Sequence, residues 1–361
     1  MKHSLSRILL ALPMLAALLA ANWLVDPAHL RQPDAYERRI ADMLAQGKAV
    51  TNVVNEDDSA ILEFSILNQK VAPDLLLLGT SKSKVISSDF FPGRRFYNAS
   101  LNGSGLDDLV VIYGLFERRG LIPREMILEV NPWLLTEGRF SQSARFAARG
   151  PTAVRSLQRG GPIEITDLPP NRSSWRAYQR FLTPDYFQSS SLALLDWAFN
   201  GNNGQPREFH EGDTPINATY LPDGSRIMPS YILSNLGSER PLAWALKYGW
   251  DPPGDVPWQI DPRQRKVLEA FVKHLADSGV KVTFYLGPYH PLSYRLMLDS
   301  PNRVVVDIQR YFIELAQSYG FTVIGSFNPA DLGVTEADFY DVTHITPEAT
   351  HRIFDLAQGI Q

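Results

Sequence analysis

The chain contains the three residue types that serine-based acyl transfer requires. Ser81 follows closely on a run of four leucines, and Asp341 and His344 are three residues apart near the C-terminus. A serine nucleophile needs a base within hydrogen-bond reach and a carboxylate that orients this base. Because Asp341 and His344 could supply both, the pattern predicts that Ser81, His344 and Asp341 act as one unit.

The same chemistry needs hydrogen-bond donors for the negatively charged oxygen of its intermediate. The candidates are the backbone amides of Ser81 and Gly103 and the side chain of Asn131. Each has an ordinary alternative. The turn at Ser81 could cap a helix, Gly103 could be a helix-start glycine, and Asn131, which precedes Pro132, could be a turn residue.

The Asp-x-x-His pattern is weak by itself, because it also occurs at Asp26 and His29, where no strand precedes it. The order of the candidate residues carries more weight. The serine, the glycine, the asparagine and the Asp-x-x-His pair each follow a separate predicted strand. In an open α/β sheet, ligands bind at the carboxyl ends of the strands.

An alternation of strands and helices positions these residues. Short apolar runs predict five strands, at 74–78, 95–98, 126–130, 281–286 and 321–324. Apolar periodicity and end signals predict helices at 106–119, 190–199, 261–278, 302–319 and 347–358. Strands that alternate with helices indicate an α/β fold with a parallel sheet of about five strands.

The N-terminus has the pattern of a membrane anchor. Lys2 and Arg7 precede an apolar run from Ile8 to Val25, which as a helix would be roughly 27 Å long. Positive charge before the run predicts a cytoplasmic N-terminus and a body in the periplasm or outside. A cleaved signal peptide is the competing interpretation. We favour an uncleaved, single-pass anchor in the inner (cytoplasmic) membrane.

The sequence predicts five segments. Residues 1–30 form the anchor, and the amphipathic pattern within residues 31–73 indicates a stalk. The α/β domain is divided into residues 74–139 and 261–361. Between them, residues 140–260 are rich in Gly, Pro, Asn and Ser. A loop of this length is improbable in a compact domain, so we expect an inserted lid or subdomain.

Composition excludes several functional classes. The net charge is −4 with no long basic run beyond the N-terminus, which argues against binding of nucleic acid. The absence of cysteine excludes disulfides, thiolate metal sites and a cysteine nucleophile. His210, Glu211 and Asp213 could suggest a metal site, but a solvated turn is the favoured interpretation. We therefore expect neither a metal site nor a cofactor.

The order of the motifs resembles the SGNH hydrolase superfamily, also called GDSL-like. The sequence Gly79-Thr80-Ser81 matches the nucleophile block of that superfamily, with threonine where aspartate is usual. Residues 98–103 look like its second block, so the resemblance assigns the glycine that binds the oxyanion to Gly103.

The last two blocks of the superfamily also have counterparts here. Asn131 matches the third block by position, although the usual Gly-x-Asn-Asp is not present, and Asp341 and His344 match the fourth. The resemblance covers about 74–133 and 281–358. It implies a three-layer, flavodoxin-like SGNH fold that carries an inserted subdomain and an N-terminal transmembrane helix.

Within the superfamily, an anchored protein with a body outside the cytoplasm looks most like the acyl-transfer branch. Its members include the D-alanyl-lipoteichoic acid transfer proteins and the alginate and cellulose O-acetylation proteins, which work beside a multispanning membrane O-acyltransferase. The resemblance implies transfer of an acyl group, acetyl above all, to a cell-surface or exported polysaccharide, or hydrolysis of such an ester. The alternatives are a non-catalytic module that binds glycan or scaffolds a membrane assembly, and an ordinary lipase-type hydrolase.

Three further residues are candidate substrate contacts. His290 lies in the loop after the strand at 281–286, and Trp133 closely follows Asn131. Lys82 adjoins the serine and could bind an anionic polymer. The alternatives are a structural histidine at position 290 and an exposed surface lysine at position 82.

Overall fold

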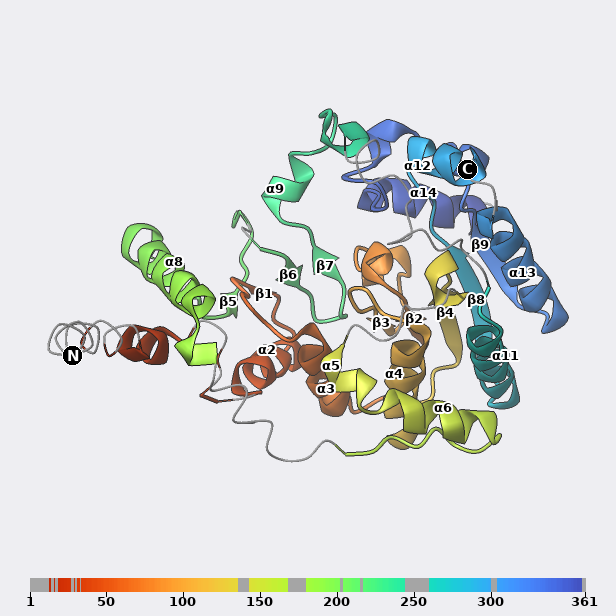
Figure 1. Cartoon of the computed structure of the whole chain (residues 1–361). Coiled ribbons are helices and arrows are strands. Elements are labelled where there is room, and N and C mark those ends of the chain that lie inside the picture. The colour runs from red at the N-terminus through yellow and green to blue at the C-terminus, as the bar shows by residue number, and fades with distance from the viewer. Residues whose placement is uncertain are drawn as a thin grey trace, which may run out of the picture.

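The computed structural model in Figure 1 has two distinct regions, a five-stranded parallel sheet with its helices and a smaller antiparallel sheet. The residues that it describes are 13, 16, 19–26, 29, 31–32, 34–135, 143–167, 180–201, 204–214, 217–243, 260–299 and 304–358.

The main sheet has five parallel strands in the order β3-β2-β4-β8-β9. Counted along the chain this order is 2-1-3-4-5, which is that of flavodoxin-like doubly wound sheets. The predicted α/β fold with about five parallel strands is confirmed, and the bounds of every strand agree with the prediction to about one residue. The strands are β2 Leu75–Leu78, β3 Phe96–Asn98, β4 Glu125–Glu129, β8 Lys281–Leu286 and β9 Thr322–Gly325.

Apolar side chains cover both faces of this sheet. Leu76 and Leu78 belong to a core shared with α4, α11 and α13, whereas Leu75 and Leu77 belong to a second core shared with α14. Neighbouring residues of a strand point to opposite faces, so the leucine run is apolar throughout because both faces are buried. The helices are α4 (Leu106–Arg118), α11 (Pro262–Asp277), α13 (Val304–Ser318) and α14 (Pro347–Gln358).

Local sequence signals set the ends of these helices. The Asp261 side chain caps α11 by accepting a hydrogen bond of 2.8 Å from the Arg263 amide, and Pro262 occupies the first helical position. After α4, Gly120 has a φ of 67°, a left-handed conformation that glycine adopts readily. The predicted bounds of the four helices are confirmed to about two residues.

A second sheet is antiparallel and has four short strands in the order β5-β1-β6-β7. β1 comes from the segment expected to be a stalk, and the other three strands come from the expected insertion. The Asn98 amide at the end of β3 donates a 2.7 Å hydrogen bond to the Asp223 carbonyl between β6 and β7, which ties the two sheets together. The strands are β1 Val50–Thr51, β5 Arg207–Glu208, β6 Thr219–Tyr220 and β7 Arg226–Ile227.

The described residues of segment 31–73, for which a stalk was expected, pack within the folded body. The predicted amphipathic helix is present as α2, but its apolar residues Tyr36 and Ile40 pack with Val50 and Tyr220 of the small sheet. α3 contacts both α2 and α4, and the sequence pattern did not predict it. The two helices are α2 (Ala35–Ala45) and α3 (Asp58–Asn68).

The first described part of the expected insertion at 140–260 is likewise integral to the main region. α5 and α6 pack on α4, and α6 also contacts α11. Arg145 and Arg149 form buried ion pairs of 2.5 and 2.8 Å with Glu63 on α3. The helix predicted at 190–199 is confirmed as α8, which begins earlier. The helices are α5 (Ala144–Ala147), α6 (Gly150–Gln158), α8 (Pro184–Asn200) and α9 (Ser230–Leu233).

Most of the predicted anchor at 1–30 lies outside the described residues. Residues 19–25 are helical. In the described part of the chain, no helix combines the length and the apolar character needed to cross a bilayer. Figure 1 shows that this N-terminal helix and α8 stand next to each other, on the side of the molecule away from the main sheet.

Candidate active site

Ser81 lies at the carboxyl end of β2, in a tight turn that requires glycine. Gly79 follows the strand, and a 3-10 helix, η1 (Ser81–Ser83), begins with Ser81. A Cβ atom on residue 79 would lie 2.6 Å from Glu129 Oε2 and 2.8 Å from Glu129 Cβ, so a larger residue would collide. In the sheet, β3 lies on one side of β2 and β4 lies on the other, so the direction in which the chain adds strands reverses at β2. Ligands bind at such a switch point in doubly wound sheets.

The structure brings Ser81, His344 and Asp341 together in one hydrogen-bonded chain. His344 Nε2 lies 2.8 Å from Ser81 Oγ, and His344 Nδ1 lies 2.7 Å from Asp341 Oδ2. Because an ionised carboxylate only accepts hydrogen bonds, Nδ1 carries the proton and Nε2 accepts from the serine hydroxyl. This is the geometry that activates a serine nucleophile.

The loop that carries Asp341 and His344 is fixed around the carboxylate. Asp341 Oδ1 accepts hydrogen bonds of 2.8 Å from the Thr343 and His344 amides, and the Tyr340 amide donates to the His344 carbonyl at 2.9 Å. Burial opposes ionisation of Asp341, but the hydrogen bond and charge of His344 and the two amides outweigh it and lower its pKa to about 2. The carboxylate is therefore charged at neutral pH and holds the imidazole in place.

A buried glutamate supports the turn that carries the nucleophile. Glu129, the last residue of β4, is fully buried. It accepts hydrogen bonds from the Thr80 amide at 2.8 Å, from the Thr80 hydroxyl at 2.6 Å and from the Ser83 hydroxyl. Sequence reasoning missed this residue, although an acid directly after the apolar run Met126–Leu128 was a visible signal.

The two proposed oxyanion residues lie in different surroundings. Gly103 is exposed in the loop after β3, which is held beside Gly79 by a 2.9 Å hydrogen bond from the Ser104 hydroxyl to the Gly79 carbonyl. Asn131 is only 1% exposed, and its amide donates to Glu129 at 3.4 Å. The backbone at Gly103 is thus near the serine turn, whereas Asn131 braces the glutamate below it.

Lys82 points into the protein, which corrects both sequence interpretations, an exposed lysine and a contact to an anionic polymer. Its Nζ donates to the carbonyls of Gly287 and Pro288 at 3.3 and 3.4 Å and lies 3.6 Å from the ring centre of Tyr289. Burial lowers the pKa of Lys82 to about 8. Trp133 packs in the same cluster, with its ring centre 5.9 Å from Nζ, and it is not among the residues that line the serine cleft.

His290 occupies a structural position beneath the Asp341–His344 loop. It is 1% exposed, its amide donates to the Val342 carbonyl at 3.2 Å, and its Nδ1 accepts from the Leu292 amide at 3.3 Å. Burial lowers its pKa. These contacts favour the structural alternative over contact with substrate.

Ser81, Asp341 and His344 open into a cleft of about 550 Å³. Its floor comes from the main region, and its opposite wall comes from the segment around β1 and from the segments that flank β6 and β7. The lining residues outside the main sheet include Val53, Val54, Asn55, Glu56, Asn217, Arg226, Met228 and Tyr231. The expected stalk and insertion therefore shape the site together.

A buried charge cluster holds this wall against the serine turn. Asp58 forms ion pairs with Lys84, just after η1, and with Arg226 of β7. The Arg226 amide also donates to the Lys84 carbonyl at 2.7 Å, and its guanidinium stacks 3.4 Å from the ring centre of Tyr220. Burial raises the pKa of Asp58, but the charges of Arg226 and Lys84 outweigh it and hold that pKa well below its ordinary range.

The residues His210, Glu211 and Asp213, considered above as a metal site, belong to a turn that is held by an ion pair. Asp213 accepts hydrogen bonds from the Arg207 guanidinium at 2.6 Å and from the His210 amide at 3.0 Å. Across the residues that the structure describes, no group of histidine, aspartate and glutamate side chains is arranged to hold a metal ion.

Comparison with models of known protein families gives no match for this chain, and comparison with curated proteins gives no match either.

Proposed function

We propose that the protein is a serine-dependent acyltransferase or esterase of the SGNH type that acts on a cell-surface or exported polysaccharide. The observation that carries this proposal is the continuous hydrogen-bonded chain from Ser81 through His344 to Asp341 at the bottom of an open cleft. The chain joins the hydroxyl of Ser81 to a base and this base to a carboxylate, which is the arrangement that activates a serine nucleophile.

In the proposed reaction, His344 Nε2 takes the hydroxyl proton as Ser81 Oγ attacks the carbonyl carbon of an acyl donor. The backbone amides of Ser81 and Gly103 stabilise the negative oxygen of the tetrahedral intermediate. Protonated His344, oriented by Asp341, gives its proton to the departing group. When this group leaves, the acyl group remains bound to Ser81 as an ester. A sugar hydroxyl or water then gives a proton to His344 as it attacks this ester, and His344 returns the proton to Ser81 Oγ as the bond between the acyl group and the serine breaks.

The assignment to the SGNH superfamily rests on motif order and topology together. The serine follows the first strand of the sheet, the glycine loop follows the second, Asn131 follows the third, and the Asp-x-x-His loop follows the fifth. The strand order 2-1-3-4-5 agrees with a flavodoxin-like fold. Thr80 stands at the position of the usual aspartate, and its hydrogen bonds to Glu129 suggest that a buried acid from β4 takes over the support of the turn.

The polar cleft and the N-terminal pattern support the choice of a glycan acceptor and a membrane partner. Asn102, Asn217 and Glu56 line the cleft beside the serine, and amide and carboxylate groups suit the hydroxyls of a sugar. The apolar run after Lys2 and Arg7 supports an anchored protein whose body lies outside the cytoplasm. There it would receive an acyl group, acetyl above all, from a multispanning membrane O-acyltransferase.

The test is covalent trapping of the serine. A fluorophosphonate probe should label the full-length protein once, and Ser81→Ala should remove the label. Ser88→Ala is the matched control, because Ser88 lies in the same segment but on the surface, and this variant should label like the wild type. A folded wild-type protein that takes no label would contradict the proposed nucleophile.

A second candidate function, a glycan-binding module of the same fold, is favoured by one observation. Asn131 donates to Glu129 and is buried, so it is not directed into the cleft where an oxyanion donor would act. In that case the wild type would bind an oligosaccharide, and Ser81→Ala would leave this binding unchanged while no acyl-enzyme forms in either protein.

A further inference from the structure

α8 exposes an unusual amount of apolar surface. Six large apolar side chains of this 17-residue helix are exposed, from 39% at Phe187 to 81% at Phe199. The exposed residues are Phe187, Leu192, Leu194, Leu195, Trp197 and Phe199. Soluble monomers rarely expose a contiguous apolar surface of this kind, and such surfaces mark contact with a protein or a membrane.

The exposed positions do not form a single stripe along α8. Leu195 and Trp197, two residues apart, lie on nearly opposite sides of the helix, whereas Leu194 shares a side with Trp197. The helix contains no lysine or arginine, and its two acids are Asp185 in the first turn and Asp196. A helix that is apolar on most sides is suited to an apolar medium rather than to one protein face.

Contacts tie the start of α8 to the predicted anchor. Asn22 donates to the Phe181 carbonyl at 2.7 Å, Trp23 packs on the Phe181 ring at 5.5 Å, and the Tyr186 hydroxyl donates to Asp26 at 2.7 Å. The neighbouring Trp23 and Leu24 are 49% and 73% exposed. The apolar surface of α8 is therefore continuous with the end of the apolar run from Ile8 to Val25.

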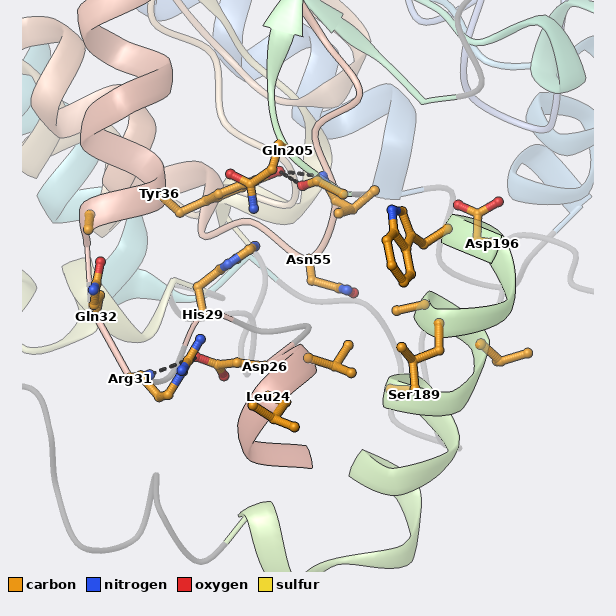
Figure 2. A pocket seen from close by; sticks show the side chains of 18 of the residues that line it. Leu24, Asp26, His29, Arg31, Gln32, Tyr36, Asn55, Ser189, Asp196 and Gln205 are labelled. Carbon is orange, nitrogen blue, oxygen red and sulfur yellow. Dashed lines mark hydrogen bonds and ion pairs between the residues drawn. The ribbon is translucent and has the colours of Figure 1, made fainter. Parts of the chain in front are cut away.

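The cleft between these two elements has two sides of different character. It measures about 940 Å³, and Figure 2 shows α8 along one side of it, with Asp26, His29 and Tyr36 opposite. The α8 side contributes Leu192, Leu194 and Trp197 together with Asp196, whereas the opposite side contributes Arg39 and Arg31, the latter paired with Asp26 at 3.3 Å. An apolar side and a cationic side match the acyl chains and the anionic headgroups of a lipid surface.

We propose that α8, together with Trp23 and Leu24, lies in the surface of the lipid bilayer beside the anchor. The bilayer covers α8, and the cationic side of the 940 Å³ cleft faces the headgroups. Val54 and Asn55 line both this cleft and the serine cleft, so the reactive serine is held close to the membrane surface. The proposal does not depend on the chemistry at Ser81.

The absence of cysteine gives a direct test, because one introduced cysteine can be labelled alone. Leu195→Cys and Phe199→Cys, each in the full chain, would carry an NBD fluorophore and be reconstituted into nanodiscs of phosphatidylcholine and phosphatidylglycerol. Lys273→Cys on α11 is the control, because that side chain is 63% exposed and lies on the main region. NBD emission at 195 and 199 should shift to the blue relative to the control, and doxyl-labelled lipid should quench it.

Two results would overturn the proposal, provided that circular dichroism shows folded protein. In the first, the labels at 195 and 199 emit and quench like the label at 273. In the second, both emit as if shielded from water but are not quenched by doxyl lipid, which would mean that protein covers α8, either a second copy or another segment of this chain. If one substitution impairs folding, the other position still gives the answer.

Discussion

The parallel sheet and the small antiparallel sheet are stabilised in different ways. The main sheet is built around fully buried apolar residues such as Leu76, Leu128 and Phe284. The small sheet has strands of two residues each and is joined to the serine turn by the ion pairs of Asp58. Apolar burial is non-directional and large in sum, whereas a buried ion pair depends on geometry and on both partners.

This difference divides the site into two parts with separate tasks. The main sheet positions the residues of the proposed chemistry, and Arg226 of the small sheet and the segments that adjoin its strands supply most of the opposite wall of the cleft. Changes in the first part should therefore affect the reaction itself. Changes in the second should affect how the substrate is held and leave the serine chain intact.

The largest expected effect is on catalysis by the serine chain. Ser81→Ala and His344→Ala should each lower the acyl-transfer rate by about 10⁶-fold, and the double variant should be no worse, because these residues act as a unit. Asp341→Asn should cost less, about 10⁴-fold, since its role is orientation. Steady-state kinetics with an activated acetyl ester would measure the rates.

The same variants need a measurement of stability. Ser81 is half-buried at the edge of a cleft, so Ser81→Ala should leave the melting temperature close to that of the wild type. A fully active, folded Ser81→Ala protein would show that Ser81 is not the nucleophile.

The next effect concerns the buried acid below the turn. Glu129→Gln leaves one of the hydrogen-bond donors of Thr80 or Ser83 without a carboxylate acceptor. We therefore expect the free energy of unfolding to fall by about 3 kcal/mol. Glu125→Gln on the same strand is the control, because its ion pair with Arg94 is exposed and should contribute less than about 1 kcal/mol. Urea unfolding of the two variants would measure the difference. Equal stabilities would show that Glu129 does not support the turn.

A third prediction follows from the low pKa of Asp341. The pKa of Asp341 is about 2 in the folded protein and lies below its value in the unfolded chain. The contribution of Asp341 to the free energy of unfolding is therefore complete above about pH 4 and is lost as the pH falls through 2. The wild type should lose about 2 kcal/mol of stability over this window that Asp341→Asn does not lose.

The control for this pH dependence is Asp355→Asn, which removes a carboxylate from a more exposed Asp–His pair on α14. It should show the same acid-induced loss as the wild type. If Asp341→Asn and the wild type have parallel stability curves between pH 5 and 2, then Asp341 is not held in the charged state by the loop.

The smallest expected effect is at the small sheet. Arg226→Ala leaves Asp58 with Lys84 alone, so stability should fall by about 1 to 2 kcal/mol and KM should rise more than kcat falls. Arg207→Ala, in the same sheet, removes only an exposed ion pair and is the control. A fall in kcat with unchanged KM at Arg226→Ala would break the proposed division between the two sheets.

The main sheet was predictable from sequence because each of its signals is local. Leu75–Leu78 and the strand at 281–286 are short apolar runs, and Asp261-Pro262 marks a helix start. The positions of Ser81 and His344 follow from these elements, since the carboxyl ends of parallel strands share one edge.

α3 was missed because it lacks the pattern of an amphipathic helix. Every residue from Ser59 to Ile66 is buried, including Glu63, since neighbouring helices pack on several of its sides. A helix that is covered all round has no apolar stripe for the sequence to reveal. The two-residue strands of the small sheet are likewise too short to show alternation.

The environment of Lys82 was missed for a different reason. Its partners, the carbonyls of Gly287 and Pro288, are about two hundred residues away along the chain. A lysine in a turn predicts exposure, and only the packing of the β8 loop against η1 reverses this.

Gly79 has a consequence for how this protein can evolve. Any side chain at position 79 would meet the carboxylate and the Cβ atom of Glu129 and the Ser83 hydroxyl, so a change at position 79 displaces the support that Glu129 gives to the turn. A single mutation at either position removes the support of the turn. An evolutionary path that changes the two positions one at a time therefore passes through a destabilised protein. In homologues that retain the serine, positions 79 and 129 should therefore be inherited as a pair.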